Sequence, residues 1–170
     1  MSVAKVDGFG VRSIGSGYNA NLERRVRDVR MVAGEALAKG DAVCFDFSGG
    51  STEPDYGWGN RVMKANGDVL LTSQSIGVAA EDISSGSIGT IRVGGFCDFA
   101  KIDGSAAAPG QLLIGGNAND ATTGLLVPID TSAAQGSGGE GDQLPVAIHI
   151  YDDGNDEADG KVFLLNPANL

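Results

Sequence analysis

The single histidine is the first residue whose type could do chemistry. His149 lies in the alternating run LPVAIHIY, residues 144–151, which predicts a half-buried strand. Acid–base catalysis needs an oriented partner beside the imidazole, and a metal site needs several ligands. The neighbouring spacing supplies neither. We therefore expect His149 to be a half-exposed residue opposite the apolar face of this strand, with no catalytic or metal-binding role. The expected apolar face consists of Leu144, Val146, Ile148 and Ile150.

Two cysteines could act as nucleophiles, bind a metal or form a disulfide. Cys44 and Cys97 each lie inside a strand-like run, and they lack the C-x-x-C spacing of redox and zinc sites. Cysteine is among the most buried residue types, and thiols stay reduced in the cytosol. We expect two buried free thiols, with a disulfide formed after cell lysis as the alternative.

An acidic stretch, residues 152–160, offers oxygen atoms of the kind that bind calcium. Its spacing differs from that of a calcium-binding EF-hand loop, although two glycines permit a tight turn. We expect a solvated hairpin tip and no cofactor, and calcium binding is the alternative. The carboxylates are Asp152, Asp153, Asp156, Glu157 and Asp159. The glycines of residues 7–17 lead to no Gly-Lys-Ser, so a nucleotide site is not predicted.

Short strands and glycine-rich turns are the elements that must position these residues. Glycine accounts for 27 of 170 residues, more than twice its average of about 7%, and tight turns demand it. The 3.6-residue period is weak throughout, and residues 22–29 fit a helix or a strand equally well. The sequence therefore predicts an all-β sandwich or barrel. The predicted strands are residues 42–47, 69–71, 90–93, 96–102, 125–129, 144–151 and 162–165.

Charge divides the chain into a basic arm and an acidic body. Residues 1–30 hold six Lys or Arg against three Asp or Glu, a net charge of +3. Residues 31–170 hold six against nineteen, a net charge of −13. We expect an extended arm over residues 1–30 that binds a negatively charged surface, and a β domain over residues 31–170. A solvated tail is the alternative. The candidate binding residues of the arm are Arg24, Arg25, Arg27 and Arg30.

Neither nucleic acid nor a membrane is an expected partner. The arginines of the arm have few interleaved aromatic residues, and the acidic body repels nucleic acid. No run approaches the roughly 18 apolar residues of a membrane helix. The first residues, MSVAKVDGFG, lack the apolar core of a signal peptide, so we expect synthesis in the cytoplasm.

Two aromatic residues lie in a polar, glycine-rich loop. Tyr56 and Trp58 occur in SGGSTEPDYGWGN, residues 48–60. Aromatic side chains in such a loop either fold back on the body or anchor a partner, because Trp and Tyr are enriched at interface hot spots. Both residues are therefore candidate binding residues.

The sequence contains two loosely similar β units. GEALAKGDAVCFD, residues 34–46, places a glycine before a dense apolar run, and GSAAAPGQLLIGG, residues 104–116, repeats the layout. We expect pseudo-repeats over about residues 32–103 and 104–170, with chance similarity between short strands as the alternative. The matched landmarks are Gly40, Val78 and Val93 in the first unit and Gly110, Val146 and Phe163 in the second.

These motifs resemble those of a known family. The frames are A-x-x-x-G-D-x-V at residues 36–43, G-V-A-x-E-D-x-x-x-G at 77–86 and G-T-I-R-V-x-G at 89–95, with a second round over 106–165. In this texture of turns and strands, residues 32–165 resemble the head decoration, or capsid cement, proteins of tailed bacteriophages. The acidic hairpin and the long basic arm depart from the family pattern.

The resemblance implies a fold and a function. It implies a β-barrel or tulip-like domain that trimerises on the outer surface of an icosahedral head, clamps neighbouring major capsid subunits and stabilises the expanded head. It implies no catalytic residues, so we expect no enzyme. Two alternatives are a trimeric β-fold enzyme of the nucleotide hydrolase type and a glycan-binding head fibre module that uses the Trp58 loop. The enzyme needs clustered Asp, Arg, Ser and Tyr motifs, which are only scattered here.

Overall fold

The computed structural model describes residues 26–46, 59–66, 75–103, 107–116, 122–129, 144–151 and 159–165. Within these ranges the chain forms strands and turns, and no helix that is long and apolar enough to cross a membrane is found there. The all-β prediction is confirmed. In chain order the strands are β1 (Arg27–Ala33), β2 (Ala42–Phe45), β3 (Arg61–Lys64), β4 (Ser75–Ala79), β5 (Ile88–Ala100), β6 (Leu112–Gly115), β7 (Leu126–Pro128), β8 (Ala147–Tyr151) and β9 (Gly160–Leu164).

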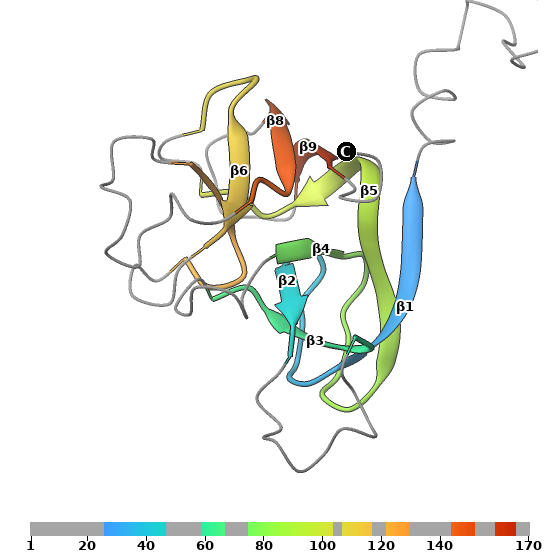
Figure 1. Ribbon diagram of the computed structural model, residues 1–170. Coiled ribbons are helices and arrows are strands. Elements are labelled where there is room, and N and C mark those ends of the chain that lie inside the picture. The colour runs from blue at the N-terminus through green and yellow to red at the C-terminus, as the bar shows by residue number, and fades with distance from the viewer. Residues whose placement is uncertain are drawn as a thin grey trace, which may run out of the picture.

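The first five strands close into a barrel, which we call the first unit. β2 pairs with β3 and β4, β4 pairs with the first half of β5, and β1 pairs with both β5 and β3. All of these ladders are antiparallel except β1–β3. Because closure pairs the two outer strands of the sheet with each other, most strand edges of the first unit are hydrogen-bonded within the unit. It forms the lower half of the molecule in Figure 1.

The second unit continues the same sheet from the second half of β5 through β9, β8, β6 and β7. A short parallel bridge pairs Ile102 with Leu126, so the start of β7 lies beside the segment that follows β5. The N–H of Leu126 donates to the carbonyl of Lys101 at 2.8 Å, and the N–H of Asp103 donates to the carbonyl of Leu126 at 2.9 Å. β5 therefore belongs to both units, as its course through Figure 1 shows.

A tight turn over residues 38–41 precedes β2. The N–H of Asp41 donates to the carbonyl of Ala38 at 3.1 Å, and Gly40 has a φ of 92°. A positive φ at the third residue of a turn is what calls for glycine there. The Asp41 carboxylate accepts the N–H of Ala38 at 2.8 Å. Two 2.9 Å hydrogen bonds then join the turn to β4, from the N–H of Gly40 to the carbonyl of Ala79 and from the N–H of Ala79 to the carbonyl of Asp41.

The second unit repeats this turn before β6. Gly110 has a φ of 88°, and the N–H of Gln111 donates to the carbonyl of Ala108 at 3.1 Å. The Gln111 side chain accepts the N–H of Ala108 at 2.5 Å, in the role that Asp41 has in the first unit. His149 exchanges two 2.8 Å backbone hydrogen bonds with Gly110 and Gln111. The prediction of two loosely repeated β units is thereby confirmed for the turns that precede β2 and β6.

The strand register extends the repeat beyond these turns, and it corrects which residues of the two units are equivalent. Val78 of the first unit corresponds to Ile148, whereas the sequence comparison matched it to Val146. Phe163 corresponds to Arg92, whereas the comparison matched it to Val93. The paired positions that show this are Ala42 with Val78 and Val78 with Arg92 in the first unit, and Leu112 with Ile148 and Ile148 with Phe163 in the second.

Among the described residues, two apolar clusters form the core. One fills the first barrel and consists of Ala33, Leu37, Val43, Val62, Ala79, Ile83 and Ile91. The other fills the second unit and includes Cys97, Phe99, Ile102, Leu113, Leu126, Ala147, Val162 and Leu164. Three fully buried residues of the first unit, Ala42, Ala65 and Val78, belong to the second cluster. The outer faces of β2 and β4 are therefore buried against the second unit, so the two units share a core.

The faces of β8 are reversed relative to the prediction over residues 147–150, whereas Tyr151 is 53% exposed, as expected. Val146 and Ala147 are both buried, so the alternation breaks between them. After the break His149 points inward and Ile150 is 41% exposed. A shift of one residue in a strand moves every following side chain to the other face, which explains the error.

Two further strand predictions differ from the structure. β5 is one strand of 13 residues, whereas residues 90–93 and 96–102 were predicted as two. Gly95 has a φ of 87°, yet it still pairs with Leu164 of β9. β3 was not predicted, and the predicted strand over residues 69–71 lies outside the described residues.

Candidate functional site

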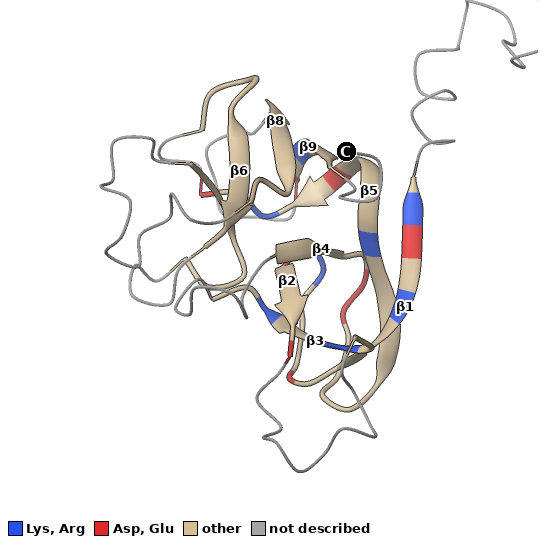
Figure 2. Cartoon of the chain, in the orientation of Figure 1, with Lys and Arg blue, Asp and Glu red and all other residues tan. Residues whose placement is uncertain are grey.

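The arginines expected to bind a partner fall on both sides of the first described residue. Arg27 and Arg30 lie on β1 and are exposed, so the end of the expected arm is a strand of the first barrel. Figure 2 shows basic and acidic residues together along this strand. The other candidates lie outside the described residues: Arg24, Arg25, Tyr56 and Trp58.

β1 offers backbone hydrogen-bonding groups as well as charge. Within the described part of the chain, residues 27–31 pair with β5 alone, and pairing with β3 begins at Val32. The N–H of Val32 donates to the carbonyl of Asn60 at 2.8 Å, on the β3 side. Because backbone groups alternate along a strand, those of Asp28 and Arg30 point to the same side, toward an edge that no described strand pairs. An open edge is a template for a strand of another protein.

The side chains beside this edge differ in how firmly they are held. Asp28 forms a two-point ion pair with Arg92, with Oδ1–Nε at 3.0 Å and Oδ2–Nη2 at 3.4 Å. Arg92 also donates to the carbonyl of Phe96 at 3.3 Å, and its guanidinium lies 4.8 Å from the centroid of the Phe99 ring. Asp28 is therefore neutralised within the molecule. Arg27 has no ion pair among the described residues.

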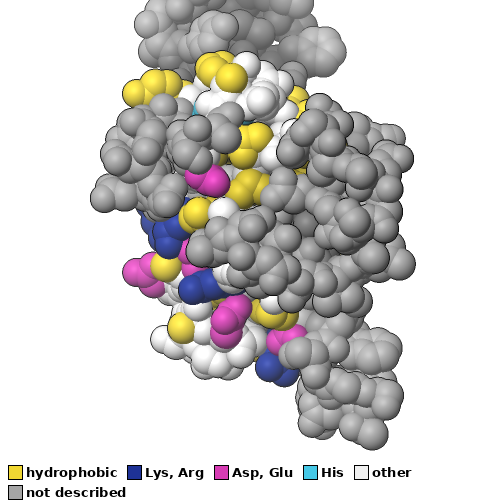
Figure 3. Space-filling model, turned by 90° about the vertical axis from the view of Figure 1, so that its left-hand side faces the viewer, with side chains coloured by type: hydrophobic (Ala, Val, Ile, Leu, Met, Phe, Trp, Pro, Cys, Tyr) yellow, Lys and Arg dark blue, Asp and Glu magenta, His cyan; other side chains and the backbone are white. Residues whose placement is uncertain are grey.

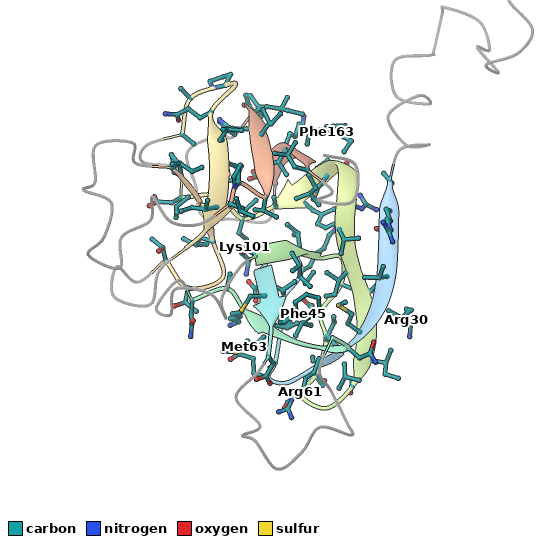
Figure 4. The ribbon with its side chains drawn as sticks, viewed as in Figure 1. Arg30, Phe45, Arg61, Met63, Lys101 and Phe163 are labelled. Carbon is teal, nitrogen blue, oxygen red and sulfur yellow. The ribbon has the colours of Figure 1, made fainter. Side chains whose placement is uncertain are left out.

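Arg30 is exposed and has one weak anchor. Its Nη2 lies 3.4 Å from the carbonyl oxygen of Ile88, and Figure 4 shows its side chain at the outer edge of the molecule. Hydrogen bonds from the side chain and the N–H of Thr90 hold the pKa of Glu81 below its ordinary 4.5, and the charge of Arg30 lowers it further. Glu81 is thus negatively charged near Arg30 at neutral pH. Because Arg27 has no ion pair among the described residues, its positive charge is the less neutralised of the two.

A buried carboxylate lies where the two units meet. The Asp41 side chain is 5% exposed, and its Oδ1 lies 2.6 Å from Nζ of Lys101. Its Oδ2 lies 3.7 Å from Nζ of Lys64. Lys101 follows β5 and points between the two halves of the molecule in Figure 4. In the sequence Asp41 stood out only as part of the motif at residues 36–43, and the distant lysines gave no signal of this cluster.

His149 is buried, and the prediction of a half-exposed histidine is wrong. The residue is 3% exposed because the break in β8 turns it inward. Neither ring nitrogen has a hydrogen-bond partner in the described structure. A catalytic imidazole needs an oriented partner, and the described residues provide none.

The prediction of two buried free thiols is confirmed for Cys44 and Cys97. Burial raises the pKa of each thiol from 9.0 to about 11. The Sγ of Cys44 donates to the carbonyl of Lys64 at 3.6 Å. Since the thiolate is the reactive form, both cysteines are poor nucleophiles at neutral pH.

The acidic stretch is described only at its end. Residues 152–158 lie outside the described ranges, so the hairpin tip and its calcium question do too. In the ranges that the structure covers, no group of three or more His, Cys, Asp or Glu could hold a metal ion.

A comparison with protein families adds the decisive observation. The family model described as phage cement protein matches residues 62–147, just over half of the chain. The chain belongs to the phage cement protein family. The matched segment of this cement protein begins in β3 and ends at the first residue of β8, so it includes parts of both units.

Family membership confirms the resemblance to capsid cement proteins and identifies a structural protein of the phage head. Among solved structures, the protein is similar to the N base of the head fiber gp8.5 of bacteriophage phi29. The sequence identity is 12% and the TM-score 0.46, over 83% of this chain and 94% of that chain. No curated protein matches.

Proposed function

We propose that this cement protein binds the outer surface of a phage capsid as a trimer and stabilises the expanded head. Family membership is the observation that carries the proposal. Its partner is the major capsid protein, and its place is the virion surface after synthesis in the host cytoplasm. The proposal contains no catalytic step, and both described thiols are protonated and buried.

The basic edge of β1 supports a way of attachment. Arg27 and Arg30 are exposed beside backbone groups that β3 does not pair. With Arg24 and Arg25 they give a run of four arginines in front of an acidic body. A strand of the capsid protein would add to this edge by main-chain hydrogen bonds, and the arginines would select an acidic partner.

Stabilisation follows from mass action. A ligand that binds the assembled, expanded head and not its dissociated subunits lowers the free energy of the assembled state. Contact with two neighbouring subunits by each bound copy gives this preference, because dissociated subunits lose one of the two contacts. The stabilisation of the head grows with the number of bound copies, so many copies of a small protein together have a large effect.

Co-sedimentation with expanded capsids that lack the protein tests the proposal. We expect saturable binding and a higher melting temperature of the decorated capsid. The Arg27→Gln, Arg30→Gln double variant should bind more weakly, and wild-type binding should weaken above about 0.15 M salt, where the Debye length is about 8 Å. A Lys39→Gln, Lys161→Gln variant, which loses the same charge at exposed positions elsewhere, should bind like the wild type.

Three results separate the parts of this proposal. Absence of wild-type binding to expanded capsids contradicts the decoration function. Binding that tolerates high salt and survives loss of the arginines contradicts the electrostatic edge, while Trp58→Ala then tests docking through the aromatic loop. Turnover of nucleotides, esters or glycosides by the purified protein would contradict the non-enzymatic assignment.

A further inference from the structure

A row of apolar side chains crosses the outer face of the second unit. Antiparallel partners lie directly opposite each other on one face of a sheet, so the pairing defines the row. Phe96 pairs with Phe163, Phe163 with Ile148, and Ile148 with Leu112. The N–H of Ile129 donates to the carbonyl of Leu112 at 3.0 Å, which adds a fifth member. We call these five residues the apolar row.

The apolar row is partly exposed to solvent. Leu112 is 44% exposed, and the other four members are partly buried. Ile150 continues the same face of β8 and is 41% exposed. Figure 3 shows hydrophobic side chains over the upper half of the molecule, where β6 and β8 lie, and the charged side chains mainly lower down. Figure 4 shows Phe163 on the outside of the upper half. Monomeric proteins rarely expose large contiguous apolar patches.

The first unit has the corresponding row in the same register, and three of its five members are covered there. Asp28 pairs with Arg92, Arg92 with Val78, and Val78 with Ala42. The N–H of Ala65 donates to the carbonyl of Ala42 at 2.8 Å, as Ile129 does to Leu112. Ala42, Ala65 and Val78 are fully buried against the second unit. The remaining pair, Asp28 with Arg92, is an ion pair where the second unit has two phenylalanines.

We infer that the apolar row of the second unit is the surface through which copies of this chain pack together. The inference deepens the proposed function, since it rests on the proposed self-association and names its surface. Each β unit then buries this face against another unit. The first unit buries Ala42, Ala65 and Val78 of its row within its own chain, and the second unit buries its row against another copy.

The composition of the row favours a second copy over the capsid protein as the occupant. Interfaces that form permanently between identical subunits are more apolar than those between proteins that meet later in solution. The row contains five large apolar side chains and no charged one, whereas the chain carries a net charge of −10. Copies that repel each other through their acidic surfaces can approach along this uncharged strip. The basic edge of β1 remains available for the capsid.

The oligomeric state of a charged variant tests the inference. Leu112→Lys places an ammonium group in the row, and its position is exposed enough in one copy for the fold to persist. The matched control is Ile88→Lys, because Ile88 is 60% exposed and lies outside the row. Light scattering at micromolar concentration should show wild type and Ile88→Lys as trimers and Leu112→Lys as a monomer, with its dissociation constant raised at least tenfold. A monomeric wild type, or a Leu112→Lys variant that stays trimeric, overturns the inference.

A second measurement does not depend on a disruptive substitution. The native thiols are buried, so Leu112→Cys adds an accessible thiol to the folded protein. Its reaction with a maleimide should slow at least tenfold between dilute, dissociated protein and concentrated protein. Ile88→Cys should react at the same rate at both concentrations. Equal rates for Leu112→Cys at the two concentrations contradict the inference even if Leu112→Lys fails to fold.

Failure of this inference and failure of the proposed function give different results. If the wild type is a trimer that Leu112→Lys dissociates, but does not sediment with expanded capsids, the row is the self-association surface and the decoration function is wrong. If the wild type binds capsids but is monomeric, the inference is wrong. In that case loss of capsid binding by Leu112→Lys assigns the row to the capsid protein instead.

Discussion

His149 is a polar side chain in an apolar position. Its counterpart in the first unit is Ala79, because both exchange backbone hydrogen bonds with the repeated turn. Neither imidazole nitrogen has a partner within the described residues, and a buried polar group without a partner costs about 1–3 kcal/mol. We predict that His149→Leu raises the free energy of unfolding by about 1 kcal/mol in urea denaturation. Capsid binding should not change.

The matched control for this prediction is His149→Gln. Glutamine keeps polar atoms at a similar side-chain volume, so the desolvation cost remains and no gain in stability is expected. If His149→Leu is less stable than the wild type, the imidazole has a partner or a role in the protein that the described residues do not reveal.

The two buried thiols predict how stability depends on alkaline pH. The pKa of each thiol is about 11 in the folded protein and 9.0 as its ordinary value. Between these values the unfolded chain loses its thiol protons while the folded chain keeps them. The free energy of unfolding should therefore fall as pH rises from 9 toward 11, by up to about 1.4 kcal/mol per pH unit for each thiol. The Cys44→Ala, Cys97→Ala variant, compared over pH 8–11, should show a shallower fall. Parallel curves would contradict the prediction.

At the scale of elements, the repeated turn before β2 and β6 is the feature most directly encoded in the sequence. A β-carbon at Gly110 would meet no atom within 4 Å, so a substitution there tests the backbone alone. We predict that Gly110→Ala lowers the free energy of unfolding by about 1–2 kcal/mol, because φ is 88°. Gly110→Asn should lose less, since asparagine tolerates the left-handed region better. Equal stability of all three proteins in denaturant titrations would show that the turn changes its conformation.

Local signals explain which elements could be predicted. Gly40 and Gly110 mark turns because their positive φ is a local requirement, and residues 42–45 form a strand because their apolar run is dense. β3 has no such signal: its four residues include Arg61 and Lys64, and tertiary pairing with β1 and β2 makes it a strand.

Non-local effects explain the errors. Gly94 and Gly95 look like a turn, yet pairing with β1 on one part of β5 and with β9 on the next keeps the strand continuous. The break in β8 moves His149 inward, and alternation alone cannot reveal a break of one residue. Of the candidate site, Arg27 and Arg30 were predicted from charge, and their role stays a prediction. The open edge beside them and the apolar row depend on strand order, which the sequence does not show.

At the scale of the whole molecule, the two units are joined by a shared apolar cluster and one buried ionic cluster. Ala42, Ala65 and Val78 of the first unit pack in the cluster that fills the second. Asp41 of the first unit holds Lys101, which follows the strand that both units share. Units joined in this way should unfold together, so calorimetry should show a single transition.

The contribution of the ionic cluster to stability can be separated from that of the turn, because the two units carry equivalent turns and only the first has the ionic cluster among the described residues. Asp41→Ala removes a turn-closing hydrogen bond and leaves Lys101 without its carboxylate, whereas Gln111→Ala removes only the equivalent turn-closing bond. We predict a loss of about 3 kcal/mol in the free energy of unfolding for Asp41→Ala, as for a broken buried pair, and about 1 kcal/mol for Gln111→Ala. Because Asp41→Ala removes the partner of Lys101, adding Lys101→Met to it should restore part of the loss by removing an uncompensated charge. Equal losses for Asp41→Ala and Gln111→Ala would mean that the carboxylate serves the turn alone and that the apolar cluster is sufficient to join the two units.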